Sequence, residues 1–561
     1  MSAARAARGK YHIWTVGCQM NQADSQRVAG ILDGLGWEET DAMDAANLVV
    51  LNTCSVREQP ERRAHGQLSL LGHAKRRRED LLVAMMGCMI GNSRQLDELK
   101  RKYPVVDLFF KVEQADILPR FLEERWTPIA GEGCVDFADL GAPRTIGISE
   151  RLPVLPMPLP PISPAFAPED IPTTRFDADP ASASPLPAAR GAGGEEPRTS
   201  GPMAVNFRPG ARELHYPTAR RPGVTLHQPT AWLPVILGCN KVCSYCIVPS
   251  RRGRERSRPV DELLTEARTL VAAGAKELTL LGQTVEAYGL DLPDPGDQDN
   301  QNGQPGRKAD LADLMALLSA IDGLARIRFM TSYPRHMTDK MIRQMAALPK
   351  VCEHVNIPVQ HGDDSMLQRM RRGYTLAEYR ALIERLRAWW PGVSLSTDVI
   401  VGFCGETEEE FQHTLDLLEE IRFDVVHVAA YSPRPGTLAY KWQDDVPLDV
   451  KKERLHRVEQ AQERIARAIN ETYLGRDEEV LIEARQVTNG EHQWRGRNRT
   501  NKLVFCPAER PTSSDDGARV GPGDLALVRI EKTTPWSLQG RLITRYDMRP
   551  ALSAALTGIP E

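Results

Sequence analysis

Short apolar runs of strand length alternate with helix-length stretches along most of this chain. Four such runs, 11–16, 47–52, 81–86 and 105–110, open it, and most begin about 35 residues after the previous one, near the ~30 residues of a βαβ unit. Buried strands joined by crossover helices favour a parallel sheet. Six further runs predict a partial, open (β/α)6 barrel: 232–237, 277–281, 327–331, 354–358, 395–401 and 425–431.

One segment interrupts this α/β pattern. Residues 141–230 hold 18 of the 41 prolines and no cysteine, which is typical of extended or disordered chain. Beyond the barrel, a charged helix is expected over 447–471, followed by strands of a small β-barrel. We therefore predict four parts: an N-terminal domain (8–126), a proline-rich linker or insertion (138–224), a barrel core (225–468) and a C-terminal β-barrel (472–545).

The composition is that of a globular protein. Of the 561 residues, 41% are hydrophobic and 26% charged, and no apolar run approaches the ~18 residues of a membrane helix. The first ten residues carry arginines with no apolar stretch behind them, so no secretory signal is expected. Ten cysteines are too few for a disulfide scaffold. A cytoplasmic location follows, in which clustered cysteines indicate metal binding or catalysis.

Three cysteines of the N-terminal part share one loop position. Cys18, Cys54 and Cys88 each follow one of the first three strands. Loops at the carboxyl ends of parallel strands meet at one edge of a sheet, so we expect these side chains to converge. The adjoining helix N-termini favour thiolate charge. The alternative is three unrelated buried cysteines; a structural zinc would need a fourth protein ligand, and none is obvious.

A second trio follows the first barrel strand. Cys239, Cys243 and Cys246 form a C-x3-C-x2-C motif. Ferredoxin motifs supply four ligands. Three thiolates can instead hold three irons of a four-iron cluster and leave the fourth open to a substrate or cofactor. The alternative is a three-cysteine zinc site that also binds water.

With Tyr245 before its last cysteine, this motif at the top of a β/α barrel resembles the radical S-adenosylmethionine (SAM) superfamily. Further motifs resemble the tRNA 2-methylthio-N6-dimethylallyladenosine synthases within it, and the C-terminal segment is similar to their RNA-binding TRAM domain. Those motifs are GCQMNQADS (17–25), NTCSVRE (52–58), GQTVEAYG (282–289), TSYPRHM (331–337), PVQHGDDSMLQRMRRGYT (358–375), DVIVGFCGETEEEF (398–411) and YSPRPGT (431–437).

The resemblance implies two [4Fe–4S] clusters and SAM as cofactors. The barrel cysteines would hold the cluster that cleaves SAM, and the N-terminal trio would hold a second cluster that carries sulfur. Gly402, Gly405 and Glu406 match a family loop near the SAM adenine, and Gln283 and Ser332 follow other barrel strands; turn or capping roles are the alternative. Cys404 stands where the family usually has proline. Arg371 and Arg372 are expected either to meet the SAM carboxylate or to lie on a solvated helix face.

Two arginine-rich segments predict RNA contacts. RRGRERSR (251–258) follows the barrel cysteines, and its Arg251, Arg252 and Arg254 are candidates to grip phosphates. Arginines at period two near the C-terminus would share one face of an extended strand and suit single-stranded loops: Arg495, Arg497 and Arg499. Solvated charge is the alternative for the first segment.

We therefore expect a radical SAM enzyme that converts N6-isopentenyladenosine next to the tRNA anticodon to its 2-methylthio derivative. Threonylcarbamoyladenosine is the alternative substrate. An RNA-binding protein with structural zinc is the alternative from another class. The expected partners are a tRNA anticodon stem-loop and an electron donor such as flavodoxin or ferredoxin, and nothing in the sequence demands more than a monomer.

Overall fold

The computed structural model describes residues 8–55, 58–78, 80–91, 93–126, 203–204, 229–292, 309–488, 490–508 and 520–546. All of these residues belong to one unit, formed by Met1–Cys134 and Pro202–Glu561. The other unit, Val135–Gly201, lies outside the described residues, as does almost all of the predicted linker.

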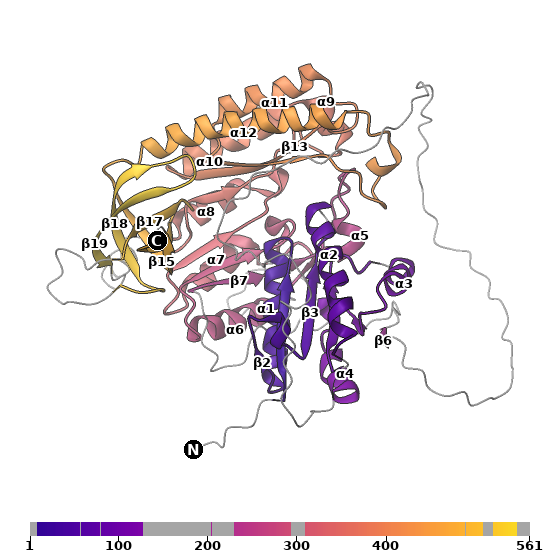
Figure 1. The fold of residues 1–561 in the computed structure, drawn as a ribbon. Helices are drawn as coiled ribbons and strands as arrows, with labels where there is room; N and C mark the ends of the chain where they lie inside the picture. Colours follow the sequence, from indigo (N-terminus) through magenta and orange to yellow (C-terminus); the bar gives the residue numbers. More distant parts are fainter. Residues whose placement is uncertain are drawn as a thin grey trace, which may run out of the picture. The chain divides into compact units, whose positions relative to one another are not determined.

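The N-terminal domain is a parallel sheet in the order β2-β1-β3-β4-β5-β6 (Figure 1). Its strands are β1 (Lys10–Thr15), β2 (Glu38–Glu39), β3 (Leu48–Thr53), β4 (Leu82–Gly87), β5 (Leu108–Phe109) and β6 (Met203–Ala204). Its helices are α1 (Gln19–Gly34), α2 (Glu58–Lys75), α3 (Ser93–Lys102) and α4 (Ile117–Arg125). The predicted parallel fold is confirmed, and every residue of β3 is buried. The linker prediction was wrong at β6, which pairs with β5.

The core is an open barrel of six parallel strands. Two sheets, β11-β10-β7 and β12-β13-β14, are joined by a parallel bridge between Ile327 and Val351, as six βα units predict. The strands are β7 (Thr230–Pro234), β10 (Glu277–Leu281), β11 (Arg326–Phe329), β12 (His354–Asn356), β13 (Ser394–Val401) and β14 (Val425–Ala430).

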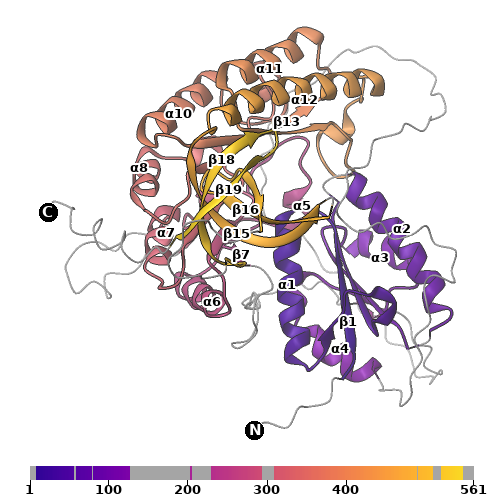
Figure 2. The same cartoon turned by 60° about the vertical axis from the view of Figure 1, so that its left-hand side comes forward.

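Helices cover the outside of these strands, and Figure 2 shows them as a curved layer. They are α6 (Val260–Ala272), α7 (Leu311–Ser319), α8 (Asp339–Ala347), α10 (Leu376–Trp389), α11 (Glu408–Ile421) and α12 (Leu448–Glu471). The starts of α10 and α11 follow from T-x-x-E sequences. Thr375 with Glu378, and Thr407 with Glu410, form reciprocal capping boxes that satisfy the first backbone N–H groups.

The C-terminal part is a closed barrel in the order β15-β16-β17-β19-β18. Its strands are β15 (Asp477–Thr488), β16 (Glu491–Asn498), β17 (Leu503–Pro507), β18 (Leu525–Thr533) and β19 (Leu538–Tyr546). Two buried arginines of β11 attach it to the core. Arg326 donates to the carbonyl of Arg497 at 2.8 Å, and Arg328 donates to those of Asn498 and Arg499 at 2.6 and 2.8 Å.

A buried ion triad joins the N-terminal domain to the core. Glu266 of α6 lies 2.9 Å from Arg27 of α1 and 2.7 Å from Arg258, and the three side chains are at most 4% exposed. Apolar contacts continue across the same boundary, because Leu237 and Leu281 belong to the hydrophobic cluster of the N-terminal sheet. Ionic and apolar contacts thus both connect the N-terminal domain to the core.

We predict that Glu266→Ala lowers the free energy of unfolding by about 3–5 kcal/mol, because it leaves two buried guanidinium groups without their shared carboxylate. Urea unfolding followed by circular dichroism measures this loss. The matched control is Glu420→Ala, which breaks the pair with Arg380 on the surface, where the side chains are 49% and 41% exposed. That change should cost at most about 1 kcal/mol. Equal losses in the two variants would contradict the assigned role of the triad.

Candidate functional site

The three N-terminal cysteines converge at the carboxyl edge of the sheet. Cys18 precedes α1, while Cys54 and Cys88 directly follow β3 and β4, which pair in register up to Thr53 and Gly87. The Asn21 side-chain oxygen lies 3.8 Å from the Cys18 sulfur and 3.9 Å from the Cys88 sulfur. The expected convergence is therefore observed.

Close packing at Gly17 brings Cys54 into the same group. The Gly17 backbone has a φ of +125°, and a Cβ there would lie 2.7 Å from Cys54 Cβ and 3.2 Å from its sulfur. A side chain at this position would therefore collide with the Cys54 side chain. Cys54 and Cys88 are buried, whereas Cys18 is exposed, so the trio is accessible from one side.

One thiol of this trio, that of Cys88, has a pKa strongly shifted by burial. Burial raises the pKa of Cys88 to about 11, with smaller increases from Cys54 and Cys18, while Arg252 acts in the opposite direction. Lys111 and Arg251 also lie within electrostatic reach of Cys88. Metal ligation needs thiolates, so a bound cation or cluster has to supply the charge that stabilises them, and these basic groups assist it.

The second trio lies on a loop that is fixed at both ends. A short hairpin, β8 (Ile236–Leu237) with β9 (Arg256–Ser257), precedes and follows it. The Cys239 N–H donates to Gly253 O at 3.1 Å, and the Ser244 N–H donates to Met370 O at 3.1 Å. Burial raises the pKa of Cys246 to about 12, and Cys239 lies 3.5 Å from the Thr284 hydroxyl. The loop is thus held rigidly across the mouth of the barrel.

Arg372 lies against this loop, which the sequence did not predict. Its guanidinium lies 3.5 Å from the Cys243 sulfur and 3.4 Å from the Tyr245 hydroxyl, and it donates to Pro358 O at 2.9 Å. The side chain is buried, so the expectation of a solvated helix face was wrong for Arg372. Arg371, with a φ of +56°, is exposed. Arg372 thus places a permanent positive charge beside the cysteine loop.

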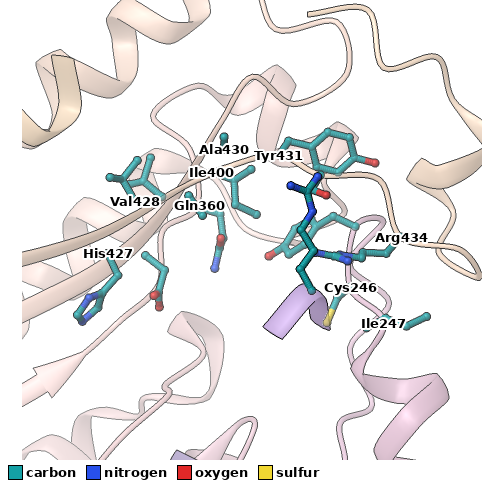
Figure 3. Close-up of a pocket in the computed structure, with 15 residues that line it drawn as sticks. Cys246, Ile247, Gln360, Ile400, His427, Val428, Ala430, Tyr431 and Arg434 are labelled. Atoms are coloured by element: carbon teal, nitrogen blue, oxygen red, sulfur yellow. The ribbon is translucent and has the colours of Figure 1, made fainter. Parts of the chain in front are cut away.

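A cavity of about 590 Å³ opens beside Cys246 (Figure 3). Its floor comes from the ends of β13 and β14, including Ile400 and Tyr431. Gln360, Asp398 and His427 supply polar groups in it. Its volume lies within the usual range for pockets that bind cofactors or small molecules.

The N-terminal domain contributes one wall of this cavity. Arg62, from α2, lines it together with Arg434 of the core. Arg434 is paired with Glu61, also on α2, at 3.0 Å. The two domains therefore enclose the cavity jointly.

The predicted SAM loop after β13 packs closely against side chains from other parts of the core. Gly402 and Gly405 have φ values of +66° and +76°, and a Cβ at these positions would lie 2.3 Å from Lys451 Cγ and 2.1 Å from Arg369 Nη1. Glu406 is buried, accepts a hydrogen bond from the Phe403 N–H at 2.9 Å, and lies 3.5 Å from Arg454. These contacts explain the two glycines and the carboxylate structurally, and their role toward SAM stays a prediction.

The two other predicted SAM residues follow β10 and β11. Gln283 is half-buried, and Ser332 is buried beside Glu286. Burial raises the pKa of Glu286 to about 7, and the neighbouring Ser332 side chain acts in the opposite direction. The residues that line the described cavity include neither of them, nor any of the three loop residues after β13.

The arginines of the first basic segment have different environments. Arg252 is the last residue of α5 (Val248–Arg252), and its Nη2 donates to Asn21 Oδ1 at 2.8 Å and pairs with Asp24 at 3.1 Å. Arg251 is half-buried, whereas Arg254 is exposed. Of these three arginines, Arg254 is therefore the one whose side chain is exposed and accessible to a phosphate.

The C-terminal arginines are also divided. Arg495 and Arg497 lie on one face of β16, because both approach Glu483, at 4.0 and 2.9 Å. Arg499 lies beyond the end of β16, pairs with Glu353 at 2.7 Å and donates to Val351 O. The prediction of one shared strand face was therefore wrong for Arg499, which contacts the core instead.

The described residues contain neither a compact metal-ion site nor a membrane-spanning helix. No three His, Cys, Asp or Glu side chains among the described residues are gathered closely enough to hold a single metal ion. Nor does any helix in the described part combine the length and the apolar character that a bilayer crossing requires.

Comparison with known families identifies the class to which this fold and site belong. The Radical SAM superfamily model matches residues 233–418, the TRAM domain model matches 471–543, and the model of Uncharacterized protein family UPF0004 matches 10–111. The open barrel with its three-cysteine loop is thus that of a radical SAM protein. The superfamily implies SAM and a [4Fe–4S] cluster as cofactors.

Curated relatives narrow the class to a family. A tRNA-2-methylthio-N(6)-dimethylallyladenosine synthase of Dictyoglomus thermophilum is 37% identical, over 96% of this chain and 100% of the relative. One of Herpetosiphon aurantiacus is 38% identical, over 96% and 98%. This chain belongs to that synthase family.

Similarity to solved structures is much weaker. The radical SAM methyltransferase TsrM from Kitasatospora setae, solved with cobalamin and a [4Fe–4S] cluster bound, is 14% identical over 77% of this chain and 74% of that one, with a TM-score of 0.45.

Proposed function

We propose that this chain replaces the hydrogen at C2 of N6-isopentenyladenosine, next to the tRNA anticodon, with a methylthio group. The names of its relatives support this reaction and favour the dimethylallyl substrate over threonylcarbamoyladenosine. The observation that carries the proposal is the presence of two separate cysteine trios, one on the barrel loop and one at the edge of the N-terminal sheet. Arg252, which follows the barrel cysteines, donates to Asn21, whose side-chain oxygen lies within 4 Å of the Cys18 and Cys88 sulfurs.

The donor sets fit the two clusters that this reaction needs. Each site offers three thiols and a nearby guanidinium: Arg372 beside Cys243, and Arg252 beside the N-terminal trio. Three thiolates leave one iron of a four-iron cluster open. No side chain is basic enough to remove the C2 hydrogen as a proton. When bound, the clusters and SAM supply a radical that removes it as a hydrogen atom, and they also supply the sulfur and the methyl group that replace it.

The residues of the chain hold and shield the reactants. Ile400, Val428 and Ala430 form an apolar wall of the cavity beside Cys246, which keeps water from a reactive intermediate. Gln360 and Asp398 offer the hydrogen-bonding groups that orient a nucleoside there. Arg372 offsets the negative charge of the neighbouring thiolates.

We expect exposed arginines to bind the RNA. Arg254 lies near the mouth of the barrel, while Arg495 and Arg497 of the TRAM domain have 37% and 41% of their side chains exposed. Such groups contact phosphates without reading sequence. A base modified on a ring carbon must leave its stack, and anticodon loops present bases that are already accessible.

We expect the protein to act as a monomer with a flavodoxin or ferredoxin as electron donor.

Nucleoside analysis tests the reaction and the substrate together. The chain is expressed in a strain that accumulates N6-isopentenyladenosine in tRNA, and digested tRNA is examined by liquid chromatography and mass spectrometry. We expect the 2-methylthio derivative to appear with the wild-type chain and to be absent with Cys239→Ala. Unchanged N6-isopentenyladenosine with the wild-type chain would contradict the proposed function, and modified threonylcarbamoyladenosine would contradict the substrate assignment.

A further inference from the structure

Arg252 connects the two cysteine sites through a short rigid path. It ends α5, which begins two residues after Cys246, so about six residues, or about 9 Å of helical rise, separate them. The next residue, Gly253, accepts the Cys239 N–H at 3.1 Å. The backbone around Arg252 is therefore tied to both the first and the last cysteine of the barrel loop.

The side chain of Arg252 reaches the other site. Its Nη2 donates to Asn21 Oδ1 at 2.8 Å and lies 3.1 Å from Asp24, with 11% and 2% of the Arg252 and Asp24 side chains exposed. That Asn21 oxygen lies within 4 Å of the Cys18 and Cys88 sulfurs. One guanidinium thus spans the space from the barrel loop to the N-terminal trio.

Asn21 cannot turn away from this contact without losing other bonds. Its amide nitrogen donates to Val16 O at 2.9 Å and to Thr53 O at 3.1 Å, which are backbone groups of the loops that carry Cys18 and Cys54. The amide therefore has its nitrogen toward the N-terminal loops and its oxygen toward Arg252. Asn21 thus links Arg252 to the backbone of the loops that carry Cys18 and Cys54.

We infer that Arg252 is a positioning residue: its guanidinium fixes the N-terminal cysteine loops relative to the barrel loop and so sets the spacing that sulfur transfer requires. This inference rests on the proposed function, in which a radical formed at the barrel must meet sulfur held at the other site. It replaces the expectation of a phosphate contact for this residue, because the side chain is only 11% exposed and is already bound within the protein.

The first test measures coupling, the ratio of 5′-deoxyadenosine formed to methylthiolated tRNA formed. We expect Arg252→Gln to raise this ratio by about 10-fold to 100-fold, because a misplacement of about 1 Å can cost that much in rate. SAM cleavage at the barrel continues, and the tRNA Kd changes less than about twofold. Arg268→Gln, an exposed control on α6, should leave the ratio and the tRNA Kd unchanged, whereas Arg254→Gln, exposed in the same segment as Arg252, should weaken tRNA binding.

A double variant separates positioning from simple loss of stability. Arg252→Gln removes a cation from the buried Asp24 carboxylate, whereas Asp24→Asn combined with Arg252→Gln removes both charges. Both variants should show the same rise in the ratio. Pulsed dipolar electron paramagnetic resonance on the reduced, reconstituted protein gives a second readout: the distance distribution between the two clusters should broaden in both variants and not in Arg254→Gln.

Two results would overturn the inference: an unchanged coupling ratio in Arg252→Gln, or an unchanged distance distribution. Weakened tRNA binding without either change would assign Arg252 to the RNA interface instead. A wild-type chain that forms no methylthiolated product would overturn the proposed function, and the distance measurement would still decide the positioning role.

Discussion

Cys246→Ala is expected to abolish the formation of 5′-deoxyadenosine from SAM under reducing conditions. Cys246 lies on the barrel loop and lines the cavity of about 590 Å³, and its loss removes one of the three thiols that would hold the SAM-cleaving cluster. With two thiolates the cluster no longer has three anchored irons and one open iron. The expected result is a rate below detection, measured by chromatography of anaerobic reactions with dithionite.

The control for this prediction is Cys506→Ala. Cys506 is buried on β17, in the core of the C-terminal barrel and away from the barrel loop of the core. That variant should form 5′-deoxyadenosine at the wild-type rate within about twofold. SAM cleavage that survives in Cys246→Ala would exclude the barrel trio as the cluster site.

Cys88→Ala is expected to separate the two halves of the reaction. Cys88 follows β4 of the N-terminal sheet and belongs to the trio around Asn21, so its loss leaves the barrel loop intact. We expect 5′-deoxyadenosine to form while the methylthiolated nucleoside falls below detection, because the radical is made but finds no sulfur. The same anaerobic reactions, analysed for both products, give this result.

Iron content provides an independent readout for Cys88→Ala. The variant should retain about four irons per chain if each trio holds one four-iron cluster. Methylthiolated product at the wild-type level would show that the N-terminal trio does not supply sulfur. Loss of both products would show that the two sites are not separable and would contradict the division of roles.

The strands and both cysteine trios could be predicted because their signals are local. Apolar runs such as the fully buried β3 identify strands directly, and the shared edge of parallel strands then brings Cys18, Cys54 and Cys88 together. Strands that carry little local signal were missed. The two residues of β2 are both exposed glutamates, and β6 lies inside a segment whose proline content predicts a linker.

The arginines could not be assigned from sequence, because their roles depend on contacts between distant segments. Arg252 binds residues 231 and 228 positions earlier, and Arg499 binds Glu353, 146 positions earlier. Arg372 follows a residue with left-handed backbone, and this turn brings it under the barrel loop. A run of basic residues predicts positive charge, but only the tertiary structure decides which side chains stay open to RNA.

The central claim is that the chain holds two four-iron clusters, one on each cysteine trio. The most direct test is Mössbauer spectroscopy with iron and sulfide analysis on anaerobically reconstituted protein, together with variants in which one whole trio is replaced by alanine. The account predicts about eight irons and eight sulfides for the wild-type chain, about four of each for either variant, and [4Fe–4S] spectra throughout. Four irons in the wild-type chain, or zinc in place of iron, would contradict it.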